Sequence, residues 1–382
     1  MEKYSAYRDP GTGIQPFLAP VAPPSPSGDV LAKIVLPIRY LIGTVRIILV
    51  LLVLGLYLIL VEGICFIFKP VAPLHRILAR LFTALLSRLA LLSAGIFWIH
   101  VECIKRKRGR QNQTADQWDP RPGDVIVSNW VSWIEILWLA FRFNPVFVLP
   151  VPASSALTSA PSKSSDPVSR TPGRRTGTGS ANVSVSTRAP RERISIIGFQ
   201  RLSLLNVLRQ SGNVPPYRVG RGLAAQSFEA IRSTSDRPIV VFPECTTSNG
   251  RGLIRFCDVF NQNIPVQGWQ VFVMCVRYDT PTILSSTLSH SIPARSVNPL
   301  SQVFNVATSI TPPNVSIRLL APSESPSSPT FLASDVLSGS YNDQLSEACA
   351  VLIAQLGKMK RTGMGWEDKA NFLEFYWGRR SS

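Results

Sequence analysis

Apolar positions form long blocks at the start of the chain and short ones afterwards. Residues 34–68 are almost continuously apolar and free of charge at their centre, so they reach the roughly 20 residues needed to cross a bilayer. A buried helix of a soluble domain is the alternative for such a run. Residues 74–100 are also apolar, but Arg76, Arg80 and Arg88 lie on one broad helical face. This second segment fits an interfacial helix as well as the second arm of a hairpin.

From residue 124 onward the apolar runs are short, and the pattern predicts strands alternating with helices. We therefore expect an α/β fold, a mixed sheet flanked by helices, behind an N-terminal apolar membrane-anchoring helical region. The expected strands are 124–128, 145–150, 237–241, 271–278 and 314–320. The expected helices are 194–209, 222–233, 341–356 and 366–376, with a further helix start at 251–255.

Segments of unusual composition predict the domain boundaries. The polar, Pro-rich start lacks the basic, apolar and small-residue regions of a secretory signal, so the anchor that follows should be retained. A later stretch rich in Ser, Thr, Pro and Arg cannot bury enough apolar surface to fold, which predicts a disordered insertion. The predicted division is a tail at 1–33, a membrane anchor at 34–100, an α/β domain at 101–152 and 194–382, and an insertion at 153–193.

The net charge of the chain indicates which kinds of partner it could bind. The formal net charge is +17 and the pI is about 10.2, which favours an anionic partner such as a membrane surface or a nucleic acid. A mean hydropathy of +0.16 favours the membrane. Six cysteines without CxxC spacing or histidine neighbours make zinc an unfavourable interpretation, so no metal is expected.

A basic run, KRKRGR at 105–110, follows the apolar region directly. Positive charges beside a membrane segment favour the cytosolic side, so the domain after them should face the cytosol. A plain solvated charge run is the alternative. The sequons at Asn112, Asn182 and Asn314 should then carry no glycan.

The loop after the strand at 237–241 carries the densest set of polar side chains and reads FPECTTSNG at 242–250. Ligands of open α/β sheets bind at the carboxyl ends of strands, where Glu244 would offer an acceptor and Gly250 a close backbone turn. With Arg251 beside it, the loop suits an anion or a polar head group, although an ordinary turn is the alternative. Its hydroxyl donors are Thr246, Thr247 and Ser248.

This loop resembles the third motif of the glycerolipid acyltransferases, the family that transfers an acyl chain from acyl-CoA to a lysophospholipid or glycerol phosphate. In most members glycine stands where Cys245 stands here. The start of the chain, MEKYSAYRDPGTGI with PFL after it, resembles fungal lysophosphatidic acid:oleoyl-CoA acyltransferases, the vacuolar-sorting-associated, lipid-droplet-linked branch. The resemblance covers residues 124–278 through the order of motifs, together with the N-terminal signature and the membrane region.

The strand at 124–128 leads into NWVSWIE at 129–135, which is similar to the family's first motif. The family places there a histidine that acts as general base and, five residues on, an aspartate that orients it. In this chain Asn129 and Ser132 fit the motif, Glu135 stands at the carboxylate and Trp130 at the base. An indole nitrogen only donates, so it cannot accept the proton. The fungal branch also departs from the usual histidine.

The sequence leaves alternatives for the general base and for the residue that binds the acceptor's phosphate. The histidines at positions 75, 100 and 290 lie outside the motifs, and Glu135 or Cys245 are the substitutes that the sequence offers, with core packing as the alternative for the thiol. The run SGNVPPYRV at 211–219 resembles the second motif, which implies that Arg218 binds the acceptor's phosphate. Its rivals are Arg209 and Arg221.

The resemblance implies a membrane-bound enzyme that acylates lysophosphatidic acid or a related lysophospholipid to phosphatidic acid, in glycerolipid and triacylglycerol synthesis. Acyl-CoA and lysophospholipid are then substrates and partners, no cofactor is bound, and the endoplasmic reticulum membrane and the lipid-droplet surface are the expected locations. The alternative is a catalytically inactive relative that binds lipid and organises droplets or vesicles. A nucleic-acid-binding protein is disfavoured by the apolar N-terminal region.

Overall fold

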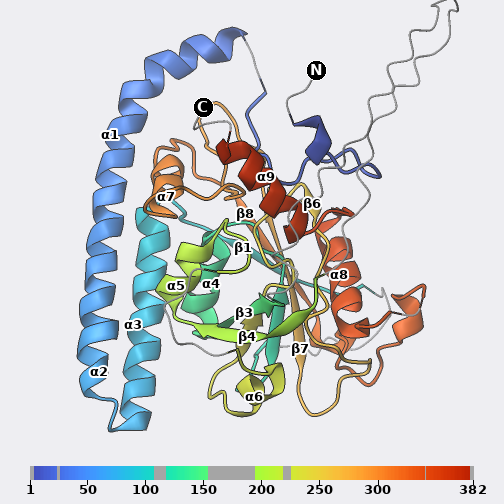
Figure 1. Ribbon diagram of the computed structural model, residues 1–382. Coiled ribbons are helices and arrows are strands. Elements are labelled where there is room, and N and C mark those ends of the chain that lie inside the picture. Colours follow the sequence, from blue (N-terminus) through green and yellow to red (C-terminus); the bar gives the residue numbers. More distant parts are fainter. Residues whose placement is uncertain are drawn as a thin grey trace, which may run out of the picture.

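A seven-stranded mixed sheet forms the centre of the molecule, which confirms the α/β prediction (Figure 1). The computed structural model describes residues 4–23, 26–106, 118–153, 194–217, 225–339 and 341–378. The predicted insertion at 153–193 and the sequons at Asn112 and Asn182 lie outside these ranges, except for Ala153. The strands are β1 (His100–Ile104), β2 (Val125–Ser128), β3 (Val146–Pro152), β4 (Ile196–Leu202), β5 (Ile239–Val241), β7 (Val271–Tyr278) and β8 (Val315–Leu320).

The spatial order of the strands is β1-β8-β7-β2-β5-β3-β4. The central strands β7, β2, β5 and β3 are all parallel neighbours, whereas β8 and β4 pair antiparallel with β7 and β3. Parallel strands carry their loops at a common side, so the loops after β2 and β5 meet at one edge of the sheet. We call this the carboxyl edge, and the opposite one, where β2, β3 and β5 begin, the amino edge.

Strand residues alternate between two hydrophobic cores. Val125 and Val127 of β2 belong to one cluster, whereas Ile126 between them belongs to the other. In β5 Val240 faces the same way as Ile126. This period of two shows that both faces of the sheet are covered, and it explains why these strands read as unbroken β-branched runs.

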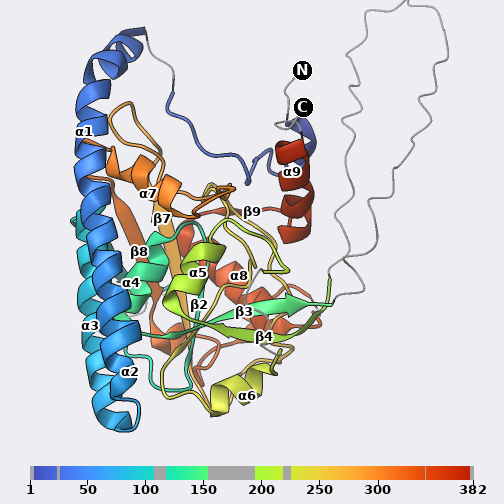
Figure 2. The same cartoon turned by 60° about the vertical axis from the view of Figure 1, so that its left-hand side comes forward.

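Helices cover the two faces. On the side of Ile126 lie α4 (Ile134–Phe143), α5 (Leu204–Gln210) and α7 (Leu300–Ala307), and on the other side lie α6 (Phe228–Ser233) and α8 (Gln344–Gly357) (Figures 1 and 2). The C-terminal helix α9 (Trp366–Gly378) lies across the carboxyl edge. The described part of the chain also has short helical turns, η1 (Ser5–Tyr7), η4 (Pro322–Glu324) and η5 (Ala333–Asp335).

The N-terminal apolar region is a helical hairpin packed along one side of the domain (Figure 2). Its first arm is α1 (Pro26–Tyr57), continued by the π-helical turn η2 (Leu58–Ile64) and α2 (Cys65–Ile67), and its second arm is α3 (Ala72–Ser93). Within the described residues, Lys33–Ile67 is the one helical stretch long and apolar enough to cross a membrane, with a mean hydropathy of 2.9. Helix α3 contains residues 74–93 of the second apolar segment and packs against α1, while its placement in or on a membrane stays a prediction.

Two arginines of α1 face the domain rather than the outer surface. Arg46 donates to the carbonyl oxygens of Ala307 (3.0 Å) and Ser309 (2.7 Å), at the C-terminal end of α7. Arg39 donates to the carbonyl oxygens of Ile283 (3.1 Å) and Thr308 (3.4 Å). Helix C-termini leave carbonyl groups unsatisfied and carry a partial negative charge, so these guanidinium groups cap α7 and hold the hairpin on the domain.

Two predicted elements are wrong in kind. The expected helix at 194–209 is instead β4 followed by the short α5, because residues 196–202 complete an antiparallel ladder with β3. The expected helix start at 251–255 is instead β6 (Gly252–Leu253), which pairs in parallel with β9 (Lys360–Arg361). Both errors have one cause, since pairing with a distant segment overrode the local pattern.

The other predicted strands and the helices at 341–356 and 366–376 are confirmed within a few residues. Residues 222–224 of the helix expected at 222–233 are outside the described ranges. The helix that is observed, α6, begins at Phe228.

The N-terminal segment 4–18 packs against α9 and the loop after β5. Tyr7 and Phe17 are buried against Phe372, with ring centroids 5.3 and 5.8 Å away. Asn249 donates through its side-chain amide to the carbonyl oxygens of Gln15 (2.7 Å) and Leu18 (2.9 Å). The segment 4–18 and α9 therefore lie together over the loop after β5 (Figure 1).

Candidate functional site

The two motif loops meet at the carboxyl edge because their strands are neighbours. β2 and β5 pair in parallel, with Val127 opposite Val241, so residues 129–135 and 242–250 start side by side. The amide of Ser248 donates to the carbonyl of Trp130 (3.0 Å), which joins the loops directly. The fold therefore brings the first and third motifs together at one edge of the sheet.

Glu244 links the first motif to the third from a fully buried position. Its carboxylate accepts from the backbone amides of Trp130 (2.5 Å) and Ile254 (3.2 Å). Burial raises its pKa to about 8, against the opposing effect of those two hydrogen bonds. In this conformation Glu244 organises the backbone of the site and has no exposed surface for a ligand.

Glu135 stands in the first turn of α4 and closes that turn. One of its carboxylate oxygens accepts from the amides of Val131 (2.5 Å) and Ser132 (2.6 Å), and the hydroxyl of Tyr278 donates to the other. Burial raises its pKa to about 7, although the hydrogen bonds oppose that shift. A carboxyl group with a pKa near neutrality has the proton affinity that general-base chemistry needs.

Asn129 and Ser132 have backbone partners. The side-chain amide of Asn129 donates to the carbonyl of Val276 (3.0 Å) and its oxygen accepts from the amide of the same residue (2.8 Å). Asn129 therefore joins β2 to β7 beyond the last ladder pair. Ser132 is buried, and its backbone amide is one of the three donors to Glu135.

Trp130 fills the position of the family's histidine completely. Its side chain is 0 % exposed, it stacks on Phe242 with ring centroids 4.9 Å apart and an interplanar angle of 21°, and its indole N–H donates to the carbonyl of Ser132 (3.1 Å). The one polar atom of the indole is thus already used. Trp130 packs the turn and offers no acceptor for a proton.

The third motif is lined by hydroxyl groups that all have protein partners. The Thr246 hydroxyl donates to the carbonyl of Asn213 (2.7 Å), and the Thr247 hydroxyl donates to the carbonyl of His290. Ser248 is buried, and its hydroxyl accepts from the amide of Gly250 (3.3 Å). Arg251, in contrast, is exposed at the rim.

Lys369 of α9 is a site residue that sequence reasoning missed. Its ammonium nitrogen lies 2.8 Å from the Thr246 hydroxyl oxygen and 2.7 Å from the Thr247 carbonyl oxygen, and its side chain is fully buried. Burial lowers its pKa well below the usual range, while the negative charge of Glu244 opposes the shift. One signal was visible, because Lys369 interrupts the apolar face of an aromatic-rich helix.

His290 is a second residue that the fold brings to the site. Its backbone amide donates to the carbonyl of Val131 (2.8 Å), and its own carbonyl accepts from Thr247, so it lies between the two motifs. Its ring Nε2 is 2.7 Å from Oδ1 of Asn298. Burial lowers the pKa of the ring to about 4, so the imidazole is neutral at pH 7. The histidines at positions 75 and 100 instead line a cavity at the amino edge.

Cys245 adopts a left-handed backbone conformation, with φ of +57°. Glycine adopts this conformation without steric cost, which explains why glycine stands here in most members of the family that the motif resembles. The thiol is buried 3.3 Å from the sulfur of Cys257, and burial raises its pKa well above the usual range. Cys245 is therefore a neutral thiol that packs the loop, which disfavours it as a base.

An apolar pocket of about 470 Å³ lies between the hairpin and the domain. Trp133 and Leu137, in and after the first motif, line it together with Arg209 and Asn298. Asn298 thus connects this pocket with His290. Arg209 is the described one of the three phosphate-ligand candidates, since Arg218 and Arg221 lie outside the described ranges. The remaining walls are mostly Leu and Val side chains of α1, α3, α5 and α7.

Comparison with known proteins yields one full-length relative. The chain is 22 % identical over 374 residues to a protein of Schizosaccharomyces pombe provisionally named a lysophosphatidic acid:oleoyl-CoA acyltransferase, and the match covers 98 % of each chain. No protein-family model and no solved structure matches the chain. The match supports the acyltransferase class without assigning a branch within it.

Proposed function

We propose that this chain is a membrane-bound acyltransferase that transfers an acyl chain from acyl-CoA to lysophosphatidic acid or a related lysophospholipid, giving phosphatidic acid in glycerolipid and triacylglycerol synthesis. The observation that carries the proposal is the apolar pocket that begins at Trp133 in the first motif and contains Arg209. An acyl chain suits the apolar walls, and a guanidinium suits a phosphate. The likeness to the fission-yeast protein supports the same class of reaction.

In the proposed reaction the acceptor hydroxyl attacks the thioester carbonyl of acyl-CoA, the new ester C–O bond forms, and the C–S bond breaks to release CoA. Glu135 is the proposed base, because it lies between the pocket residues Trp133 and Leu137 and burial brings its pKa to about 7. Its carboxylate is fully buried in this conformation, so the proposal requires that the turn at 130–132 opens toward the acceptor. The proton of the hydroxyl would pass to its carboxylate and then to the departing thiolate. Alignment of two substrates contributes up to about 7–11 kcal/mol, which suits a site with a weak base.

In this proposal the polar loop after β5 supports the substrate head group. Thr246, Thr247 and Ser248 hold the loop together with Lys369, while Arg251 stands exposed at its rim. Glu244 keeps the two motifs in register through its bonds to Trp130 and Ile254. No cofactor is part of the proposed chemistry, since an acyl thioester is already activated.

The deciding experiment is transfer of labelled oleoyl-CoA to lysophosphatidic acid by the purified full chain in detergent. We expect product from the native chain, a loss of at least about a hundredfold in Glu135→Gln, in line with removal of a general base, and a raised KM for the acceptor in Arg209→Gln. Lys358→Gln, an exposed substitution, is the matched control. Equal turnover in native chain and Glu135→Gln would remove Glu135 from the mechanism.

One observation favours a second candidate, a catalytically inactive relative that binds lipid and organises lipid droplets or vesicles. Trp130 occupies the base position, and the hydroxyl groups of the third motif already have protein partners. This candidate predicts lysolipid binding in the apolar pocket without turnover. Trp130→His separates the two, because gain of turnover in that variant alone would identify the native chain as the inactive form.

The proposed location is the endoplasmic reticulum membrane and the lipid-droplet surface, with the domain facing the cytosol. Supporting this, the outward side of the hairpin exposes large apolar side chains, among them Leu52, Ile59 and Leu81. Such a surface suits a lipid environment. Fractionation of cells that express the full chain, with protease protection of the domain as the readout of orientation, tests both parts.

A further inference from the structure

A second, larger cavity of about 1260 Å³ opens at the amino edge of the sheet. Arg121, Asn144 and Arg237, which line it, stand just before β2, β3 and β5. These strands are parallel neighbours, so their starts lie at one edge and the motif loops at the other. A strand of four residues such as β2 rises about 13 Å, which makes the cavity separate from the acyltransferase motifs.

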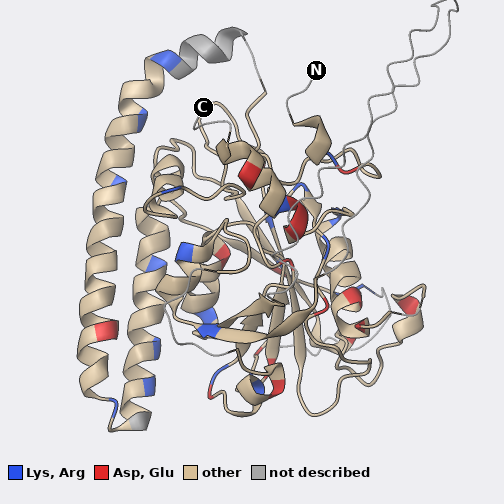
Figure 3. Cartoon of the chain, viewed as in Figure 1, with Lys and Arg blue, Asp and Glu red and all other residues tan. Residues whose placement is uncertain are grey.

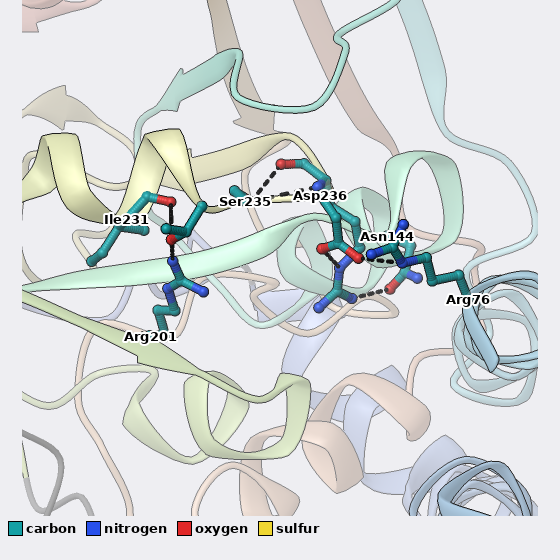
Figure 4. A network of polar contacts seen from close by, with 8 residues as sticks. Arg76, Asn144, Arg201, Ile231, Ser235 and Asp236 are labelled. Carbon is teal, nitrogen blue, oxygen red and sulfur yellow. Dashed lines mark hydrogen bonds and ion pairs between the residues drawn. The ribbon is translucent and has the colours of Figure 1, made fainter. Parts of the chain in front are cut away.

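The lining of this cavity is strongly basic. It includes six arginines and two aspartates, so arginine exceeds aspartate by four charges. Arg76 and Arg237 share the carboxylate of Asp236, with nitrogen to oxygen distances of 2.9 and 3.6 Å, and Arg237 also donates to Asn144 (3.3 Å) (Figure 4). One aspartate between two arginines leaves that network itself positive.

Three further lining arginines have no partner for their guanidinium groups among the residues that the structure describes. Within the described part of the chain, the side chains of Arg80, Arg121 and Arg142 make no hydrogen bond or ion pair, and all three are exposed. They come from α3, from the segment before β2 and from the last turn of α4. Convergence of guanidinium groups from three elements suits a phosphate, whose oxygens they grip in pairs.

The rim of the cavity is apolar and continuous with the outer face of the hairpin. Trp98 is 75 % exposed and Ile77 is 65 % exposed, and both line the cavity. Leu81 and Leu85 extend the exposed apolar surface along α3. Basic positions recur along the same helix (Figure 3). Exposed tryptophan beside arginine is typical of a membrane interface, where the ring lies at the level of the head groups.

We infer that this cavity binds the phosphate head group of an anionic phospholipid in the surface to which the hairpin attaches, as a second lipid site apart from acyl transfer. The phosphate contacts Arg80 and Arg142, and the acyl chains leave over Trp98 and the apolar side of α3. A soluble phosphate would use the arginines but would gain nothing from that rim. The inference rests on the proposed membrane attachment and is independent of catalysis.

The test uses the full chain, reconstituted in nanodiscs without detergent, in two binding experiments. The first measures binding of short-chain phosphatidic acid added as a soluble probe. The second measures binding of the same chain to vesicles with about 20 % phosphatidic acid in phosphatidylcholine. Each cationic side chain near an anionic surface contributes about 1 kcal/mol, which strengthens binding about fivefold. Arg80→Gln with Arg142→Gln should therefore weaken both kinds of binding roughly thirtyfold.

Two controls make the result specific. Lys358→Gln with Lys360→Gln removes the same charge from exposed positions outside the cavity and should change binding less than about threefold. Arg80→Lys with Arg142→Lys keeps the charge but loses the planar fork, so it should fall between the native chain and the glutamine variant. Equal losses in the two glutamine variants would mean general charge attraction only and would overturn the site.

Two further results decide whether the phosphate comes from a lipid or from solution, and whether binding is independent of catalysis. If inorganic phosphate competes with the lipid probe at equal concentration, the site is one for soluble anions and the lipid assignment is wrong. If native binding is lost in the glutamine variant while the native chain transfers no acyl group, the inference stands and only the proposed enzyme activity fails. If the variant binds like the native chain, the inference fails whatever the turnover.

Discussion

Charged side chains are buried and hydrogen-bonded at the carboxyl edge of the sheet, whereas several at the amino edge are exposed. At the carboxyl edge Glu135, Glu244 and Lys369 are fully buried, and each contacts protein partners at 2.5–3.2 Å. At the amino edge Arg80 and Arg142 are exposed and without side-chain partners in the described part of the chain. A buried polar group that loses its partner costs free energy, whereas an exposed one returns to water.

The difference teaches that a motif is not by itself an open binding site. The carboxyl edge contains every described residue that the family resemblance selects, yet its side chains mainly hold two loops, α9 and the N-terminal segment together. The amino edge has no recognised motif, yet its cavity is larger than the apolar pocket beside the hairpin, and Arg80, Arg121 and Arg142 there have no side-chain partner among the described residues. Stability should depend on the first edge and binding of anions on the second.

The largest expected effect is at Lys369. Lys369→Met keeps the length of the side chain but leaves Thr246 and Thr247 without their buried donor, so we expect a loss of about 3 kcal/mol in the free energy of unfolding. Urea unfolding of the full chain in detergent measures it. Lys358→Met, an exposed control, should lie within about 0.5 kcal/mol of the native chain. Similar values for the two variants would show that the buried contacts do not stabilise the carboxyl edge.

A smaller loss is expected at Asn249. Asn249→Ala removes the two hydrogen bonds to Gln15 and Leu18, which should cost about 2 kcal/mol and release the N-terminal segment. Limited proteolysis near residue 15 should become faster in step with the loss of stability. Asn314→Ala, at an exposed hydrogen bond to Asp279, is the control and should leave the cleavage rate unchanged. An unchanged rate in Asn249→Ala would mean that the aromatic contacts with α9 suffice.

The next largest effect is a pH dependence of the free energy of unfolding, caused by Glu135. Burial raises the pKa of Glu135 from 4.5 to about 7, so the folded state holds its proton more tightly than the unfolded state does. Stability from this group is complete below about pH 4.5 and falls as the pH rises to about 7. Glu135→Gln lacks this loss, so its unfolding free energy relative to the native chain should rise over that window and then level off. Parallel curves from about pH 5 to 8 would contradict the shift.

The smallest effect is expected at the amino edge. Arg76 and Asp236 form an ion pair at 2.9 Å, but their side chains are 62 % and 39 % exposed. Solvent screens such a pair, so Arg76→Gln should change the free energy of unfolding by less than about 0.5 kcal/mol. Thermal unfolding at low and high salt checks this, with little difference expected between them. A loss comparable to that of Lys369→Met would end the contrast between the two edges.

Local patterns were sufficient for much of the fold. Unbroken β-branched runs predicted β2, β5 and β7, because strands covered on both faces need apolar side chains in both directions. Length and apolarity predicted the long helix of the hairpin. The same patterns failed for β4 and β6, whose partners β3 and β9 lie far away in the sequence, so that nothing local recorded the pairing.

The sequence by itself determined which loops bring carboxylates to the edge where the parallel strands end, since Glu135 and Glu244 follow buried strands. Only the tertiary structure decided what surrounds them. It placed Lys369 of the C-terminal helix and His290 of a long loop against the third motif, buried Trp130 on Phe242, and gathered arginines from separate elements at the opposite edge. The reason is physical: desolvation and hydrogen-bond partners depend on segments far apart in the chain, and a local pattern holds no information on either.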